Sequence, residues 1–222
     1  HGVFRRQRQM CIRDRYIRPL LMGSGPILGV APAPEYTFLV FTSPVGPYFK
    51  GGITPTSLRV SERFHRAAPG GSGGVKAIGN YAPGMIPSKM AKKEGYSEII
   101  YLDAVNHRYI EEVGAANFFC VKDGVISTPE LTGTILPGVT RASIIELAMA
   151  RGYEVREEKV DVEYAMSADE CFCVGTAAVV SSIGRIQYGE RVKEYYSGEV
   201  GPVTRELYLS LIHISEPTRP MN

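Results

Sequence analysis

A glycine-rich stretch that leads into a single lysine constrains this chain more than any other sequence feature. Four glycines lie between positions 70 and 74, just before Lys76 and the pair Asn80-Tyr81. Glycine removes side-chain bulk and permits positive φ, so the backbone here can pass close to a large, flat group. If an apolar pocket strips water from the Lys76 ammonium, its pKa falls and the neutral amine can attack a carbonyl carbon. The alternative is an ordinary flexible loop that ends in a solvated lysine.

The composition is that of a globular protein with a small-molecule partner. The chain has 222 residues, of which 44% are hydrophobic and 22% are charged, so it can bury a core in one or two domains. Its net charge of +2 creates no overall field that would attract nucleic acid or an anionic membrane. The sequence therefore predicts small-molecule substrates, no nucleic acid and no membrane.

The positions of cysteine and histidine argue against a metal site and for a reducing compartment. Cys11, Cys120, Cys171 and Cys173 lack the spacing of metal ligands, and the four histidines are scattered. No apolar run is as long as a membrane span, and the basic N-terminal residues lack the hydrophobic stretch of a signal peptide. We expect no metal, reduced thiols and a cytoplasmic location.

The two ends differ in character from the rest of the chain. Residues 1–15 are basic and without periodicity, and residues 210–222 follow no pattern set by the helix before them. Both resemble translated sequencing adapter, which predicts a non-native extension and tail on an N-terminally truncated protein; the alternative is a basic arm and tail for an anionic partner. Between them we expect a remnant of a small domain at 16–49, an interdomain linker at 50–57 and a large domain at 58–209.

The pattern between the ends alternates strands and helices, which predicts a mixed α+β or α/β fold. Residues 35–49 are expected to form a buried strand of the small domain. In the large domain, Thr140 is the expected N-cap of a helix and Gly152 its end. The expected elements there are a strand at 57–67, a helix at 79–95, a strand at 97–105, a hairpin at 109–129, a helix at 140–152 with a strand after it, a helical turn at 167–170, a strand pair at 171–184 and a last helix at 200–209.

Several residues meet the needs of a pyridoxal phosphate (PLP) site, which requires a lysine for the aldehyde and partners for the phosphate and the pyridine nitrogen. Lys76 is the candidate lysine. The helix that opens at Leu136–Arg141 offers free N–H groups and a positive dipole end to a phosphate. Glu112 could keep the pyridine nitrogen protonated, which would leave its neighbour Glu111 solvated. The simpler interpretations are an ordinary capped helix and a charge at a strand edge.

Two further features could hold a substrate carboxylate. Gly175-Thr176-Ala177 interrupts an apolar run, so its N–H groups could form an anion nest; the alternative is a β-bulge. Tyr16 and Arg18 are two residues apart on an expected strand and therefore project to the same side. Arginine can grip a carboxylate through two hydrogen bonds while tyrosine donates a third, although Arg18 could equally be a surface charge.

Six segments, in this order, resemble the branched-chain amino acid aminotransferases, which are class IV, or fold type IV, PLP enzymes. They are YIRP at 16–19, SPVG at 43–46, GGVKAIGNYAP at 73–83, EEVGAANFF at 111–119, GTILPGVTR at 133–141 and GTAAVVSSIG at 175–184. The resemblance implies a C-terminal large PLP-binding domain with a remnant of the N-terminal small α/β domain. It also implies a homodimer that transaminates leucine, isoleucine and valine with 2-oxoglutarate.

The resemblance assigns roles to individual residues. Lys76 resembles the Schiff-base lysine, Tyr81 the tyrosine that bonds the phenolic oxygen of the cofactor, and Glu112 the partner of the pyridine nitrogen. The implied phosphate ligands are the backbone amides of Val139 and Thr140 and the side chain of Thr176. The implied substrate carboxylate site consists of the amides of Thr176 and Ala177 with Tyr16 and Arg18, and Leu28 and Val30 match a loop that covers the substrate side-chain pocket of the other subunit.

The chain departs from the family pattern upstream of Tyr16, where nothing matches the small-domain arginine that grips the phosphate. Two alternatives therefore stay open. The first is another class IV activity, D-amino acid transamination or aminodeoxychorismate lyase, against which YIRP favours the branched-chain enzymes. The second is a catalytically inactive fragment of such an enzyme.

Overall fold

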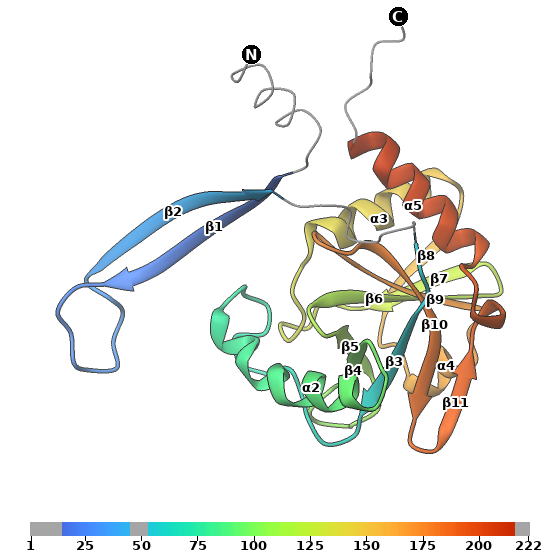
Figure 1. Ribbon diagram of the computed structural model, residues 1–222, viewed down its shortest axis with the longest axis horizontal. Coiled ribbons are helices and arrows are strands. Elements are labelled where there is room, and N and C mark those ends of the chain that lie inside the picture. The colour runs from blue at the N-terminus through green and yellow to red at the C-terminus, as the bar shows by residue number, and fades with distance from the viewer. Residues whose placement is uncertain (1–14, 45–52, 216–222) are drawn as a thin grey trace, which may run out of the picture. The chain divides into compact units, whose positions relative to one another are not determined.

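The computed structural model describes residues 15–44 and 53–215, and the chain divides into two units, His1–Lys50 and Gly51–Asn222 (Figure 1). This division falls at the start of the expected linker at 50–57. The end of that stretch belongs to a strand, because β3 (Thr56–Ser61) begins at Thr56.

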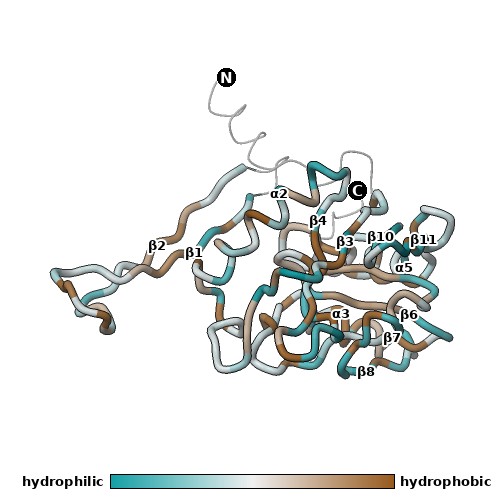
Figure 2. The backbone as a smooth tube through the Cα atoms, turned by 90° about the horizontal axis from the view of Figure 1, so that it is seen from below, coloured by the Kyte–Doolittle hydropathy of each residue, from teal (hydrophilic) through white to brown (hydrophobic). Residues whose placement is uncertain are grey.

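In the first unit, the described residues form one antiparallel hairpin. Strand β1 (Arg15–Ser24) pairs with β2 (Glu35–Pro44) along its whole length. The prediction of a buried strand at 35–49 is wrong for the described part, because Phe38 and Val40 are 65% and 54% exposed. Two strands bury little of each other's side chains, and no further strand of the described chain joins them. Brown segments along β1 and β2 in Figure 2 mark hydrophobic residues, several of which are exposed.

The second unit is built on a closed barrel of six strands. The pairing runs from β3 through β4 (Glu98–Leu102), β5 (Ile110–Val113), β6 (Ala116–Lys122), β9 (Glu170–Gly175) and β10 (Val179–Tyr188), and returns to β3. Strand β3 is parallel to both of its neighbours, and the other pairs of this circle are antiparallel. The barrel is extended by β7 (Val125–Pro129) and β8 (Glu154–Glu158) beyond β6, and by β11 (Arg191–Glu194) beside β10.

Strict alternation along the central strands produces two separate cores. On β6, Phe118 and Cys120 join the core that every strand of the circle lines, whereas Phe119 and Val121 face the opposite side. That second face is covered by α3 (Val139–Ala150) and α5 (Pro202–Ser215), which lie side by side in Figure 1. Buried aromatic rings such as Phe119, which stacks on Phe172 at 5.0 Å, fill the space between sheet and helices.

The remaining helices are short. Helix α2 (Met85–Lys93) packs against β4, and α4 (Val162–Met166) contributes Val162 and Ala165 to the barrel core. Single turns of 3₁₀-helix occur at η1 (Ile78–Asn80), η2 (Ala82–Gly84) and η3 (Tyr196–Gly198). The mixed α/β class and most of the predicted strands and helices are confirmed.

Two helix predictions are wrong. Residues 167–170 do not belong to a helix. The helix of this region, α4, begins after its N-cap Asp161 and ends at Met166. The last residue of the stretch, Glu170, instead lies in β9 and accepts hydrogen bonds from the N–H groups of Val203 and Thr204 at the start of α5. The N-cap of α3 is Gly138 rather than Thr140, and the contact that leaves no room for a side chain at Gly138 is described below.

No helix in residues 15–44 and 53–215 is long and apolar enough to cross a membrane. Within the same residues, no three histidine, cysteine, aspartate or glutamate side chains gather as metal ligands. Cys120, Cys171 and Cys173 are buried free thiols, and Cys11 lies outside the described residues.

Candidate functional site

The segment Gly133–Gly138, between β7 and α3, is the backbone against which the glycine-rich loop packs. A Cβ atom on Gly73 would lie 2.4 Å from the Thr134 carbonyl oxygen, and one on Gly74 would lie 3.1 Å from that of Gly133. Close approach of two backbones therefore requires these glycines. Of the four glycines before Lys76, only Gly70 has positive φ, at +76°.

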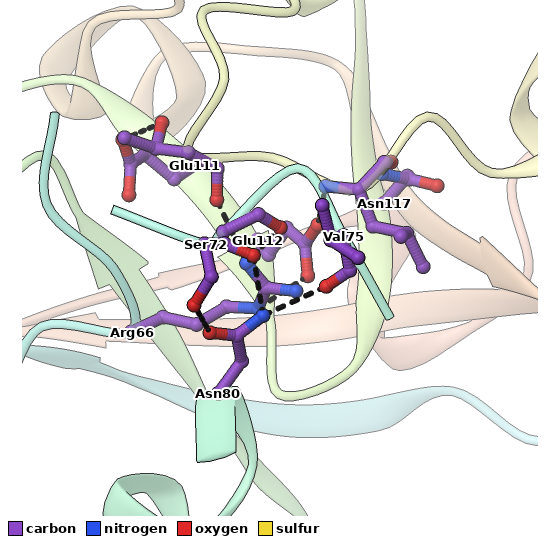
Figure 3. A network of polar contacts seen from close by, with 10 residues as sticks. Arg66, Ser72, Val75, Asn80, Glu111, Glu112 and Asn117 are labelled. Atoms are coloured by element: carbon purple, nitrogen blue, oxygen red, sulfur yellow. Dashed lines mark hydrogen bonds and ion pairs between the residues drawn. The ribbon is translucent and has the colours of Figure 1, made fainter. Parts of the chain in front are cut away.

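Asn80 holds the loop that carries Lys76 in a fixed shape. Its Nδ2 donates to the carbonyls of Ser72 at 2.6 Å and Val75 at 2.7 Å, and its Oδ1 accepts from Ser72 Oγ at 2.7 Å (Figure 3). Asn80 is buried, so these bonds are shielded from water. These hydrogen bonds between Asn80 and the residues Ser72 and Val75 close the loop into a ring and fix its shape.

Lys76 lies on this ring beside Tyr81, with its Nζ 5.9 Å from the centroid of the aromatic ring. Lys76 is exposed in the described chain, so the described residues do not enclose it in an apolar pocket. Most residues of the loop are exposed, and Tyr81 is the aromatic residue that the described part of the chain places beside Lys76. Tyr81 Oη, in contrast, is buried and has no hydrogen-bond partner among the described residues. A buried phenol without a partner is poised to bond an atom of a ligand.

Glu112 is the buried acid of the site, only 1% exposed. Its Oε1 accepts a hydrogen bond of 2.7 Å from the Leu136 N–H, and its Oε2 lies 2.7 Å from Arg66 Nε. Burial raises the pKa of Glu112 to about 7, and Arg66, the Leu136 N–H and Lys76 oppose that rise. A carboxyl with a pKa near neutral pH changes its charge readily when a charged ligand atom binds beside it.

Glu111 was expected to be solvated, and that prediction is wrong. It is 6% exposed, and its Oε1 accepts a hydrogen bond of 2.5 Å from Thr134 Oγ1. Alternation along a regular strand would place Glu111 and Glu112 on opposite faces, but the β4–β5 register shifts at this point. The irregular strand directs both acids away from the barrel core.

The N-terminus of α3 meets β5, β6 and β9 around one side chain, Asn117. Its Nδ2 donates to the Leu136 carbonyl at 3.0 Å, and a Cβ on Gly138 would lie 2.3 Å from its Oδ1. This contact explains why a glycine, in extended conformation, precedes the helix. No side chain caps the helix, so the amides of Val139 and Thr140 in its first turn suit an anion.

The turn that joins β9 and β10 lies next to the same region. Asn117 pairs with Val174 on β9, and a Cβ on Gly175 would lie 3.8 Å from that of Ala116. Thr176 and Ala177 follow and are exposed, and Val179, where β10 begins, has φ of +55°. Positive φ at a β-branched residue is strained by about 1–3 kcal/mol, and such strain is typical of binding sites.

Seven of the expected site residues thus belong to the second unit. They are Lys76, Tyr81, Glu112, Val139, Thr140, Thr176 and Ala177. The others, Tyr16, Arg18, Leu28 and Val30, belong to the hairpin unit. There the Arg18 guanidinium lies 4.9 Å from the centroid of the Tyr16 ring, so the two side chains share a face, as their spacing predicts.

Sequence reasoning missed four residues that build the site: Arg66, Asn80, Asn117 and Thr134. Three of them stand inside the motifs quoted above, but as polar side chains without a chemical role of their own. Arg66 precedes the glycine-rich loop, and its Nη1 donates to the Thr134 carbonyl at 2.8 Å. A lone arginine in a strand-to-loop segment carries no signal that it will be buried.

Gly73→Ala should destabilise the protein by about 1–3 kcal/mol, because the added methyl group would meet the Thr134 backbone and the Ala67 side chain. Urea denaturation measures the effect through the midpoint. Gly79→Ala is the matched control in the same loop, since its Cβ would meet nothing within 4 Å. Equal midpoints for the two variants would show that the loop does not pack closely against Thr134.

The raised pKa of Glu112 should make stability fall as the pH rises from about 4.5, where the unfolded chain releases this proton, to about 7. The folded protein holds the proton more tightly, so the loss reaches up to about 3 kcal/mol above that window. Glu112→Gln should remove this slope in urea denaturation at several pH values. Glu206→Gln is the contrast, because Tyr153 and Arg151 lower the pKa of Glu206 and its slope has the opposite sign. An unchanged profile for Glu112→Gln would contradict the assignment.

Comparison with known proteins gives one consistent answer. Residues 5–186 match the family model described as amino-transferase class IV. The chain is 56% identical over 196 residues to branched-chain-amino-acid aminotransferase 5, chloroplastic, of Arabidopsis thaliana, and the match covers 88% of this chain and 47% of that protein. The chain therefore spans about half the length of the curated relatives it matches.

Solved structures agree with this similarity. The Escherichia coli branched-chain amino acid aminotransferase superposes with a TM-score of 0.78 at 34% identity, over 90% of this chain and 64% of that one. The branched-chain aminotransferase of the archaeon Thermoproteus uzoniensis, solved with norvaline, superposes with a TM-score of 0.79 at 29% identity, over 90% of this chain and 64% of that one. A further branched-chain amino acid aminotransferase, solved with pyridoxamine 5'-phosphate, superposes with a TM-score of 0.83 at 29% identity, over 96% of this chain and 69% of that one.

Proposed function

Because this chain belongs to the class IV aminotransferase family, we propose that it forms the PLP-binding part of a transaminase for branched-chain L-amino acids. The proposed substrates are leucine, isoleucine and valine, with 2-oxoglutarate as amino acceptor. The observation that carries the proposal is that the segment Gly133–Gly138 connects three parts of the site. It packs against Gly73 and Gly74 of the loop that carries Lys76, donates a hydrogen bond to Glu112 and leads into the N-terminus of α3. The names of the similar proteins support the substrate class.

The residues present fit PLP. The unpartnered Tyr81 Oη suits the phenolic oxygen, and the buried Glu112 suits the pyridine nitrogen. The uncapped amides of Val139 and Thr140, with the Thr176 hydroxyl, suit the phosphate. When bound, PLP supplies a sink for the electron pair released at the substrate Cα.

Each of these side chains has a defined task in the proposed reaction. Lys76 would hold the cofactor aldehyde through its amine, and its Nζ, when free, would be the base for the proton of the substrate Cα. Glu112 would keep the ring nitrogen of the cofactor protonated, and Arg66 holds Glu112 in place. In the second unit, the amides of Thr176 and Ala177 would bind the substrate carboxylate. In the hairpin unit, Tyr16 and Arg18 share a face and are also proposed as carboxylate ligands.

We extend the proposal to a homodimer with shared sites. Leu28 and Val30 lie in the connection between β1 and β2, and both side chains are fully exposed. In a dimer they would cover the substrate side-chain pocket of the other subunit. The buried reduced thiols are consistent with a cytoplasmic location, which we propose although the similar Arabidopsis thaliana protein is chloroplastic by name. A fluorescent fusion would test that location.

Turnover of L-leucine, D-alanine and aminodeoxychorismate tests the function. The proposal predicts 2-oxo acid formation from L-leucine with 2-oxoglutarate, dependent on added PLP. Preference for D-alanine or aminodeoxychorismate would support the other class IV activities. Binding of PLP without any turnover would support an inactive fragment.

A further inference from the structure

Two adjacent glutamates occupy the irregular point of β5, and the reaction proposed above uses one of them. In the β4–β5 pairing, Tyr101 faces Glu112 and Leu102 faces Ile110, so Glu111 has no partner residue on β4. Ile110 and Val113 both face the barrel core as a result. This is the arrangement of a β-bulge, in which one extra residue redirects a side chain.

Glu111 and Glu112 both accept hydrogen bonds from the segment Gly133–Gly138, Glu111 from Thr134 and Glu112 from Leu136. Glu111 Oε1 accepts the 2.5 Å bond from Thr134 Oγ1, which also lies 2.9 Å from Thr132 Oγ1. Its other oxygen, Oε2, is buried without a hydrogen-bond partner in the described chain. Burial of a carboxyl oxygen without a hydrogen-bond partner costs free energy, so packing alone does not explain a glutamate at this position.

Arg66 connects the two acids. Its Nη1 donates to the Thr134 carbonyl at 2.8 Å while its Nε lies 2.7 Å from Glu112 Oε2, and its side chain is 3% exposed. Figure 3 shows this guanidinium between the Asn80 loop and Glu112. The path from Glu111 to Glu112 therefore consists of the Thr134 hydroxyl, the Thr134 carbonyl and the Arg66 guanidinium.

We propose that Glu111 is a positioning residue: by anchoring Thr134, it orients the carbonyl that fixes Arg66, and Arg66 in turn holds Glu112 in place for the ring nitrogen. The inference rests on the proposed function for its purpose, but the coupling itself belongs to the chain alone. The charged groups around Glu111 are Asp103, which disfavours its charge, and Arg66 and His65, which favour it. For Glu112, the charges of Arg66 and Lys76 favour the ionised form and the charge of Glu111 disfavours it.

The coupling predicts that cutting the Glu111–Thr134 bond changes the titration of Glu112. With Thr134→Val, Arg66 loses its fixed orientation and holds the Glu112 carboxylate less well. The pH midpoint of the Glu112 carboxyl should then rise by about one pH unit. Thr134→Ser keeps the hydroxyl and should restore the wild-type midpoint. A carboxyl ¹³C NMR titration of the full chain without cofactor measures this, with the signal assigned by its loss in Glu112→Gln.

Ser127→Ala is the matched control. It removes another buried hydroxyl-to-glutamate bond, Ser127 Oγ to Glu158 at 2.6 Å, at a position on β7 that is not part of the path. It should lower stability and leave the Glu112 midpoint unchanged. If Thr134→Val fails to fold, Thr134→Ala removes the same hydroxyl without changing the charge of Glu111 and should give the same rise.

A second measurement separates this inference from the proposed function. Titration of each variant with PLP, followed by absorbance, gives the dissociation constant of the cofactor. A raised Glu112 midpoint in Thr134→Val without PLP binding by any form would support the coupling and refute the function. Normal PLP binding by the wild-type chain with equal midpoints in Thr134→Val, Thr134→Ser and Ser127→Ala would overturn the inference.

Discussion

Replacement of Lys76 by alanine is expected to abolish the reaction and the covalent attachment of PLP. Alanine has no amine to hold the aldehyde or to carry the proton from the substrate Cα, so turnover should fall by at least about 10³-fold. PLP added to this variant should keep the absorbance of the free cofactor. Stability should change by less than about 0.5 kcal/mol, because Lys76 is exposed and its side chain is not buried in a core.

Lys89→Ala is the matched control for this loss. Lys89 is also exposed and lies on α2, outside the candidate site. It should retain wild-type turnover and the wild-type cofactor spectrum. Similar losses in both variants, or a Lys76→Ala protein with an unchanged spectrum, would remove Lys76 from the mechanism.

Replacement of Arg66 by methionine is expected to cause the largest loss of stability, about 3–5 kcal/mol at neutral pH. The substitution leaves Glu112 buried without its cation and removes the donor to the Thr134 carbonyl. Breaking one partner of a buried pair costs far more than breaking an exposed one. Urea denaturation at neutral and acidic pH measures the loss, which should shrink at low pH as Glu112 is protonated.

Two companion variants test the reason for that loss. Arg151→Met breaks an ion pair with Glu206 that is 2.8 Å long but half exposed, and should cost no more than about 1 kcal/mol. Combining Arg66→Met with Glu112→Gln should recover part of the loss, because the unpaired charge is gone. Equal costs for Arg66→Met and Arg151→Met, or no recovery in the double variant, would contradict the buried-pair account.

Local patterns predicted the elements well where one face of each was consistently apolar. The helix at α3, its end at Gly152 with φ of +86°, and the hairpin turn at Asp123 and Gly124 followed from such patterns. The pairings that close the barrel, β10 with β3 and β6 with β9, join residues far apart in the sequence. No local periodicity carries that information.

The reactive groups of the site could be predicted from the sequence, but the residues that hold them in place could not. Lysine, tyrosine and glutamate in these motifs suggest chemistry by their type, whereas the burial of Arg66 and Thr134 depends on which segments meet in three dimensions. Glu111 was misplaced because alternation assumes a regular strand, and the irregular β4–β5 register cannot be read from IEEV. The helix α3 begins one residue before Thr140, with Gly138 as its N-cap, and contact with Asn117 leaves no room for a Cβ at position 138.

Chemical mapping of the lysine that reacts with PLP tests the central claim most directly. The full chain is incubated with PLP, reduced with borohydride and digested, and the modified peptides are identified by mass spectrometry. Our account predicts one dominant modification, on Lys76, that is lost when L-leucine is added before reduction. Modification spread over exposed lysines such as Lys89 and Lys92, or its absence from Lys76, would contradict it.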